Sequence, residues 1–257
     1  MKSRSMSLID SKQRFSSRVD NYVRFRPSYP TEVFDTLERE CGLTRDSAIA
    51  DIASGTGIFT KLLLEHGNRV FGVEPNPDMR RAGEEFLSQY PRFTSVNGTA
   101  ESTTLPDASV DFVTAAQAGH WFDIPKASRE FTRILEPEGW LVLVWNERQT
   151  DLAPFLRDYE QLLLRYGTDY NEVRHEHAAV GTFYDPHPCQ ERTFELRQEF
   201  DYEGVKGRLL SSSYAPGPEH PNHPAMLAEL RRIFDLRQRN GKVSFDYITR
   251  LYYGRLA

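Results

Sequence analysis

Short β-rich runs alternate with longer amphipathic runs from about residue 47 to residue 148, and this alternation constrains the fold more than any other feature. The strand-like runs occupy residues 47–53, 68–74, 92–97, 109–117 and 139–147. Between them lie helix-like runs at residues 57–67, 76–90 and 124–136. Strands that alternate with helices are typical of crossover units, which build a mostly parallel sheet with helices on both faces. We therefore predict a doubly wound α/β sheet.

The second half of the chain departs from this alternation. An irregular stretch rich in His and Pro is expected at residues 168–190. Helical patterns occur at residues 152–167, 203–213 and 223–240, and strand-like ones at 192–202 and 243–254. We expect an N-terminal helical lid over residues 1–45 and a ligand-binding core over residues 46–148. Residues 149–257 would add cap helices and the final strands of the same domain.

Composition and charge exclude several classes of protein. The 257 residues carry 32 basic and 37 acidic side chains, a net charge of −5, which does not favour nucleic acid or an anionic membrane as a partner. No apolar run approaches the roughly 20 residues that span a bilayer, and the polar start lacks a secretory signal, so a cytoplasmic location is expected. Cys41 and Cys189 are too few for a cysteine-rich metal site, and no metal is expected.

The turn at residues 51–60, DIASGTGIFT, follows the first predicted strand, where open parallel sheets bind their ligands. Gly55 and Gly57 allow the backbone to approach a ligand closely. A dinucleotide fingerprint would have a third glycine where this chain has Thr60, and it would bring a pyrophosphate close to the carboxylate of Asp51. A ligand with an ammonium group and no phosphate avoids that repulsion, as S-adenosylmethionine does.

Glu74 ends the second predicted strand, where a carboxylate can accept hydrogen bonds from both ribose hydroxyls. The segment NGTAESTTLPDASVDFV then joins the third strand to the fourth. Its backbone near Thr99, Ala100 and Glu101 can read an adenine edge. Each feature alone also fits an ordinary turn or a solvated acid, so the prediction depends on their occurring together.

In this order and spacing the chain resembles the class I S-adenosylmethionine-dependent methyltransferases of the type-11 group. The resemblance covers at least residues 20–148 and is carried by DIASGTG, VEPNPDM, GTAESTTLPDASVD, AQAGHWFD and RILEPEGWLVLV. The motifs AQAGHWFD and YVRFRPSYP look more particularly like trans-aconitate-methyltransferase-like proteins, which act on small molecules. The family fold is a Rossmann-like sheet of seven strands whose last strand is antiparallel, and residues 243–254 are the candidate for that strand.

By position, the resemblance implies the following cofactor contacts. Asp51, Ala53, Gly55 and Gly57 would line the methionine end. The ribose would lie against Glu74 and Pro75, the adenine against Thr99, Ala100 and Glu101, and the methyl group beside Gln117. Two positions depart from the family pattern, because Ala53 replaces a glycine and Thr99 replaces an aspartate that contacts the adenine amino group in many relatives.

The N-terminal segment and the region after the fourth strand are the candidates for the lid and the acceptor pocket. Tyr22, Arg26 and Tyr29 would close over the cofactor, with Arg26 meeting its carboxylate; the alternative is a packed helix with Arg26 on the surface. His120 is placed to orient or deprotonate an acceptor, or else it is a structural histidine. The pocket wall would include Trp121, and a second location for the pocket is the segment around Tyr214.

The reaction implied is O-methylation of a carboxylate or hydroxyl on a small molecule, in which the acceptor attacks the methyl carbon in line as the sulfonium leaves. An NAD-dependent oxidoreductase would share the first crossover unit, and a non-catalytic regulator could share the whole fold. The sequence leaves open whether the protein is a monomer or a homodimer. It also leaves the identity of the acceptor open.

Overall fold

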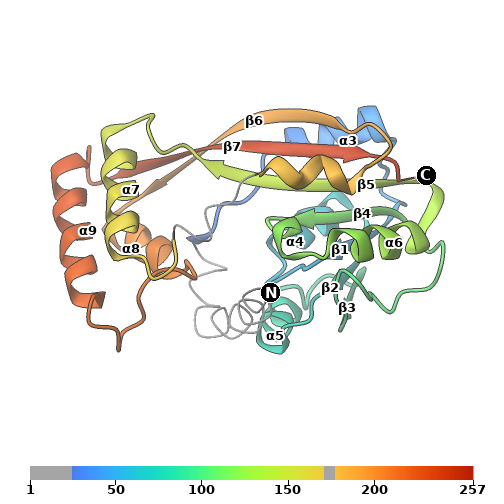
Figure 1. The fold of residues 1–257 in the computed structure, drawn as a ribbon, viewed down its shortest axis with the longest axis horizontal. Helices are drawn as coiled ribbons and strands as arrows, with labels where there is room; N and C mark the ends of the chain where they lie inside the picture. The colour runs from blue at the N-terminus through green and yellow to red at the C-terminus, as the bar shows by residue number, and fades with distance from the viewer. Residues whose placement is uncertain (1–24, 171–176, 257) are drawn as a thin grey trace. The chain divides into compact units, whose positions relative to one another are not determined.

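The computed structural model describes residues 25–170 and 177–256 (Figure 1). The chain forms two compact units, each assembled from separate segments. The first, called the core unit, comprises Ser28–Asn146, Glu176–Phe194 and Thr249–Ala257. The second, called the accessory unit, comprises Met1–Pro27, Glu147–His175 and Glu195–Ile248. The division predicted at residues 45 and 148 stays a prediction.

Seven strands form a single sheet in the order β3-β2-β1-β4-β5-β7-β6. Their bounds are β1 Ala48–Ile52, β2 Arg69–Val73, β3 Phe93–Val96, β4 Val110–Ala116, β5 Leu135–Arg148, β6 Gln190–Phe200 and β7 Val243–Gly254. The strands β1 to β5 pair in parallel, whereas β7 is antiparallel. The predicted Rossmann-like sheet of seven strands, with residues 243–254 as the antiparallel strand, is therefore confirmed.

The helices fall where the amphipathic runs indicated. Their bounds are α3 Glu32–Cys41, α4 Ile58–His66, α5 Pro77–Phe86, α6 Ile124–Ile134, α7 Pro154–Tyr166, α8 Tyr202–Leu210 and α9 His223–Arg237. Local signals fix several ends: Asn76 caps α5 by accepting hydrogen bonds from the amides of Asp78 and Met79, and Gly67 ends α4 with a left-handed φ of 112°. No helix among the described residues is long and apolar enough to cross a membrane.

Alternation along the central strands places apolar side chains on both faces of the core unit's sheet. On one face Leu141 and Leu143 pack with Phe131 of α6, and on the other Val142 and Val144 join the cluster that includes Leu63 of α4. All six side chains are fully buried. Because both faces are covered, the residues that meet solvent and ligands are those at the strand ends.

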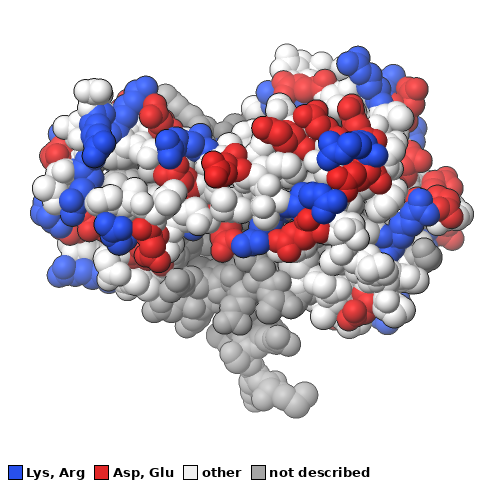
Figure 2. All heavy atoms as spheres, turned by 90° about the horizontal axis from the view of Figure 1, so that it is seen from above, with Lys and Arg blue, Asp and Glu red and all other residues white. Residues whose placement is uncertain are grey.

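The accessory unit has an apolar core of its own. It includes Leu156 and Leu163 of α7, Val205 of α8, Leu230 of α9 and Phe245 of β7, each 1% exposed or less. The aromatic rings of Phe155 and Tyr159 meet that of Phe245 edge to face. Charged side chains of both signs are interspersed over the face shown in Figure 2.

Three details differ from the sequence-based expectations. The fifth strand begins at Leu135 rather than at residue 139. Val110 pairs with Leu135 and the next pair is Phe112 with Trp140, so the intervening residues bulge out. The fourth strand ends at Ala116, since Gln117 adopts a left-handed φ of 59°. The stretch expected to be irregular contains a 3₁₀ helix, η2, at His177–Phe183.

Candidate functional site

Parallel pairing brings the carboxyl ends of β1 to β4 to one edge of the sheet. Ile52 lies opposite Val73, and Val73 lies opposite Val96, so the loops that follow these three strands start side by side. β4 pairs with the other side of β1 and delivers the segment after Ala116 to the same edge. Every site residue predicted in residues 51–121 lies within or directly after these strand ends.

The first loop owes its shape to three left-handed residues. Ala53, Gly55 and Gly57 have φ values of 54°, 60° and 86°. A Cβ at Gly57 would lie 2.7 Å from Leu87 Cδ1, whereas a Cβ at Gly55 would meet only Met79 Cε, at 3.4 Å. Gly57 is thus required by packing as well as by its backbone. Ala53 adopts the conformation that a glycine would adopt in its place, at a cost of roughly 1–2 kcal/mol.

Asp51 lies beneath this loop and is 1% exposed. Its carboxylate accepts hydrogen bonds from the hydroxyls of Thr60, at 2.6 Å, and Thr114, at 2.9 Å. Burial raises the pKa of Asp51 to about 6, although the two threonine hydroxyls oppose the shift. The side chain therefore holds the start of α4 to β4 from inside the protein. Its predicted contact with a ligand ammonium group stays a prediction.

Glu74 directly follows β2, is 7% exposed and connects two of the loops. Its Oε2 accepts a hydrogen bond from the Gly55 amide at 2.9 Å, and its Oε1 accepts one from the Asn76 amide at 2.8 Å. The two amides fix the orientation of the carboxylate between the loops that follow β1 and β2. Pro75, half-buried between Glu74 and Asn76, continues the same turn.

The loop after β3 is tightly folded. The backbones of Thr99 and Ser102 exchange hydrogen bonds of 3.0 and 3.2 Å, so the Thr99 amide is already engaged. Ala100 is 5% exposed, and Glu101 Oε1 accepts a hydrogen bond from the Asp123 amide at 3.0 Å. These contacts fix the loop that was predicted to border an adenine, and that role stays a prediction.

The segment after β4 turns sharply into a short 3₁₀ helix, η1, at Gly119–Trp121. Gln117 donates from Nε2 to the Asn146 carbonyl at 3.3 Å. The ring of His120, an exposed residue, lies 4.5 Å from the ring of Trp121, measured between centroids. The predicted acceptor-side pair is thus adjacent in space, and it follows the same strand end as Gln117.

The remaining predicted residues divide between the two units. In the core unit, the ring of Tyr29 meets Phe59 of α4 edge to face at 5.0 Å. In the accessory unit, Arg26 donates to the Ser211 carbonyl at 3.0 Å, and the ring of Tyr214 lies 4.8 Å from that of Tyr170. Tyr22 lies outside the described residues. The lid function of this segment stays a prediction.

Sequence reasoning missed the partners that hold these groups. Thr60 was noted only as a missing glycine, and Thr114 was not singled out, although the strand register places Thr114 directly opposite Asp51. A polar residue inside an apolar parallel strand is the signal that could have identified Thr114. Among the described residues, no three His, Cys, Asp or Glu side chains are grouped to hold a metal ion.

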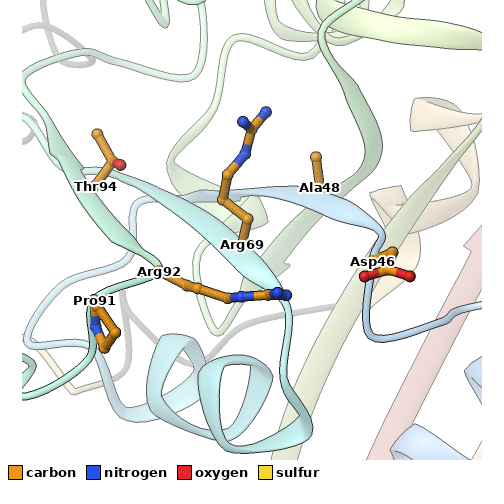
Figure 3. A pocket seen from close by; sticks show the side chains of 6 residues that line it. All are labelled: Asp46, Ala48, Arg69, Pro91, Arg92 and Thr94. Carbon is orange, nitrogen blue, oxygen red and sulfur yellow. The ribbon is translucent and has the colours of Figure 1, made fainter.

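A pocket of about 500 Å³ lies at the opposite edge of the sheet (Figure 3). Its lining includes Ala48 and Arg69, which begin β1 and β2, and Arg92, which precedes β3. Because open α/β sheets bind their ligands beyond the carboxyl ends of the strands, this pocket at the amino ends is separate from the candidate site.

Comparisons with known proteins identify relatives of the core region. A family model of a methyltransferase domain matches residues 50–143. An uncharacterized methyltransferase of Mycobacterium bovis is 38% identical over 62% of this chain and 62% of its own length. A relative from Saccharomyces cerevisiae, named for S-adenosylmethionine-dependent methyl transfer, is 30% identical over 52% of this chain and 47% of its own. These matches thus cover less than two thirds of each relative.

A solved structure is similar over most of the chain. It is a candidate type II methyltransferase from Anaeromyxobacter dehalogenans, 25% identical, with a TM-score of 0.66 over 90% of this chain and 98% of that one. The likeness extends beyond the region that the family model matches, so it includes the strands after Arg148 as well as the candidate site.

Proposed function

We propose that the protein, whose residues 50–143 match the model of a methyltransferase domain, transfers a methyl group from S-adenosylmethionine to a small-molecule acceptor. The observation that carries the proposal is the position of Glu74. Its carboxylate follows β2 and bonds to the Gly55 amide in the loop after β1, where the ribose of a nucleoside cofactor would lie.

The donor set at this edge fits that cofactor. Glu74 supplies a carboxylate, a group that accepts hydrogen bonds from ribose hydroxyls, and the glycines at the left-handed positions 55 and 57 keep side chains away from the loop. Ala53, Pro75 and Gln117 would complete the methionine and ribose contacts, and Thr99, Ala100 and Glu101 the adenine contacts. When bound, S-adenosylmethionine supplies a methyl group activated by its sulfonium.

On the acceptor side the described residues include a titratable group, His120, with Trp121 as an apolar wall beside it. For a hydroxyl acceptor, the imidazole would accept the proton that must leave. For a carboxylate acceptor no base is required, and the same side chain would only orient the substrate. We favour an oxygen acceptor of one of these two kinds on a small molecule.

Two alternatives make different predictions. An NAD-dependent oxidoreductase would have to place a pyrophosphate close to the buried carboxylate of Asp51. It would also lack the third glycine of the dinucleotide-binding loop, since Thr60 stands there. Both features disfavour this alternative. A non-catalytic regulator would bind S-adenosylmethionine and transfer nothing. Neither nucleic acid nor membrane is proposed as a partner, and the protein would act as a monomer or a homodimer.

Two experiments test the function in sequence. Titration calorimetry should detect S-adenosylmethionine and its demethylated product S-adenosylhomocysteine, and little or no NAD; tight NAD binding alone would overturn the proposal. A cofactor labelled in its methyl group should then transfer label to at least one member of a panel of small acids, phenols and amines. Binding without transfer to any member would favour the regulator.

A further inference from the structure

The accessory unit contains a buried group of cationic and phenolic side chains that the proposed function does not use. We call it the arginine–tyrosine cluster. It consists of Arg26, Arg148, Tyr159, Glu160, Tyr170, Arg208, Tyr214 and Tyr247. Its members come from the segment before the core unit, from β5, from α7 and the residues after it, from α8 and the turn after it, and from β7.

Arg208 is the most deeply placed cation of the cluster, at 6% exposed. Its Nε donates to the hydroxyl of Tyr247 and its Nη1 to the hydroxyl of Ser212, both at 3.3 Å. Both partners are neutral and both contacts are long, and no described acid forms an ion pair with it. A buried guanidinium normally has a carboxylate or phosphate partner, because desolvation of an uncompensated charge is costly.

The carboxylate of the cluster itself, that of Glu160, is already engaged by other members of the cluster. Glu160 Oε2 accepts hydrogen bonds from Arg148 Nη2 at 2.6 Å and from the hydroxyl of Tyr170 at 2.7 Å. Arg148 and Arg208 together carry two positive charges, and Glu160 carries one negative charge, so one positive charge is not balanced by these three residues. Arg148 Nη1 and the hydroxyl of Tyr159 are also buried with no hydrogen-bond partner in the described structure.

The pKa of Tyr214 shows the effect of the positive charge in the cluster. Burial by itself would raise the pKa of its phenol, but the guanidinium groups of Arg208, Arg148 and Arg26 lower it below its usual value. Three cations therefore face one hydroxyl. Guanidinium groups and phenol hydroxyls all donate hydrogen bonds, and a carboxylate accepts them in a matching geometry. Its single negative charge would also balance the positive charge that Glu160 leaves uncompensated.

We propose that the arginine–tyrosine cluster binds the carboxylate of a small molecule, with Arg208 as its main ionic partner. The carboxylate is that of a small molecule held within the accessory unit, so the inference goes beyond the function proposed above. Binding of the carboxylate itself requires no turnover.

The test compares Arg208→Met with Arg232→Met in the full-length protein. Arg232 is the control because it is 61% exposed on α9 and pairs with Glu229, so its loss removes the same charge from the same unit. Succinate and tricarballylate serve as carboxylate probes, and succinamide as the neutral probe, at constant ionic strength. The carboxylates should raise the Tm of the wild type and of Arg232→Met, and succinamide should not.

Arg208→Met should bind the carboxylate probes at least tenfold more weakly, while its Tm without ligand stays equal to or above that of the wild type. The second expectation follows because an apolar side chain replaces a buried charge, and a purely structural arginine would instead lower the Tm. Arg208→Lys, which keeps the charge and loses the planar fork, should bind with intermediate affinity and serves if the methionine variant does not fold.

Calorimetry with S-adenosylhomocysteine is the control for the core unit. Its affinity should be unchanged in Arg208→Met, because the cofactor contacts proposed at the strand ends lie in the core unit. Equal responses of wild type and Arg208→Met to every probe would overturn the inference. If the carboxylates bind but no methyl group is transferred, the proposed function is wrong and this inference stands. If methyl groups are transferred to neutral acceptors but the carboxylates do not raise the Tm, this inference is wrong and the proposed function stands.

Discussion

The hydroxyl of Thr60 donates a hydrogen bond of 2.6 Å to the carboxylate of Asp51, and the two side chains are 0% and 1% exposed. Thr60 stands where a dinucleotide-binding loop has its third glycine. In this protein the residue at that position, which belongs to α4, donates a hydrogen bond that stabilises the buried carboxylate of Asp51. The loop above the acid is therefore tied to the helix below it through a side chain rather than through close backbone packing.

The stability of the protein should depend on pH through the ionisation of Asp51. Its folded pKa, about 6, lies above the ordinary 3.8, so its favourable contribution is complete below about pH 4 and is lost as pH rises through 6. The loss amounts to about 3 kcal/mol. In urea unfolding followed by tryptophan fluorescence, the stability of wild type relative to Asp51→Asn should fall by this amount between pH 4 and 7. A difference that does not vary with pH would contradict the shift.

Thr60→Val keeps the shape of the side chain and removes the donor. The buried carboxylate of Asp51 then loses a charge-assisted hydrogen bond. The free energy of unfolding should fall by about 1.5–3 kcal/mol at pH 7, and by less at pH 4, where Asp51 is protonated. Thr132→Val is the control, because this exposed threonine donates only to the Ser128 carbonyl within α6. Equal losses at both pH values would show that the hydroxyl does not act through the charge.

Gly57→Ala should destabilise the protein more than Gly55→Ala. Both require a left-handed alanine, at roughly 1–2 kcal/mol, but only the Cβ at residue 57 would overlap Leu87 and add a further 1–3 kcal/mol. Chemical denaturation of the two variants measures the difference. In a double-mutant cycle Leu87→Ala should couple to Gly57→Ala by about 1 kcal/mol and not to Gly55→Ala; absence of coupling would rule out the overlap.

Glu74→Gln tests the ribose contact. The amide has one acceptor oxygen, so it cannot keep the bonds to both the Gly55 and Asn76 amides and still serve both ribose hydroxyls. Affinity for S-adenosylhomocysteine should fall at least roughly tenfold in calorimetry, corresponding to the loss of a charge-assisted bond. Glu65→Gln, on the exposed part of α4 beside Lys61, should bind normally. An unchanged dissociation constant in folded Glu74→Gln would exclude the contact.

His120→Ala separates cofactor binding from turnover. The imidazole follows β4, whereas most of the predicted cofactor contacts come from the loops after β1 to β3, so cofactor affinity should be unchanged. With a hydroxyl or amine acceptor, kcat should fall by about 10²–10⁴-fold, as for a positioned base. With a carboxylate acceptor the effect should be smaller and appear as a raised KM. His220→Ala, in the accessory unit, is the control; if both variants behave as wild type, His120 has no role in the reaction.

The order and type of nearly all these elements were predictable because each strand and helix has its own hydrophobic period. Glu74 was also identifiable, since an acid directly after a short apolar run marks a strand end. The partners of Asp51 were not, because Thr114 reaches it only through the pairing of β1 with β4. Arg208 was missed for a similar reason: in sequence it is one more polar residue of a helix, and its burial depends on side chains from distant segments.

The composition of the accessory unit has a consequence for how the chain folds during synthesis. The ring of Phe25 lies against the bare backbone of Gly207, where even a methyl group would be 2.1 Å from the ring. The first of these residues leaves the ribosome long before the second exists. At the usual rates of translation, this contact waits about ten seconds or more for its partner, so the N-terminal segment emerges without its docking surface. Until then the ring of Phe25 has no Gly207 to pack against.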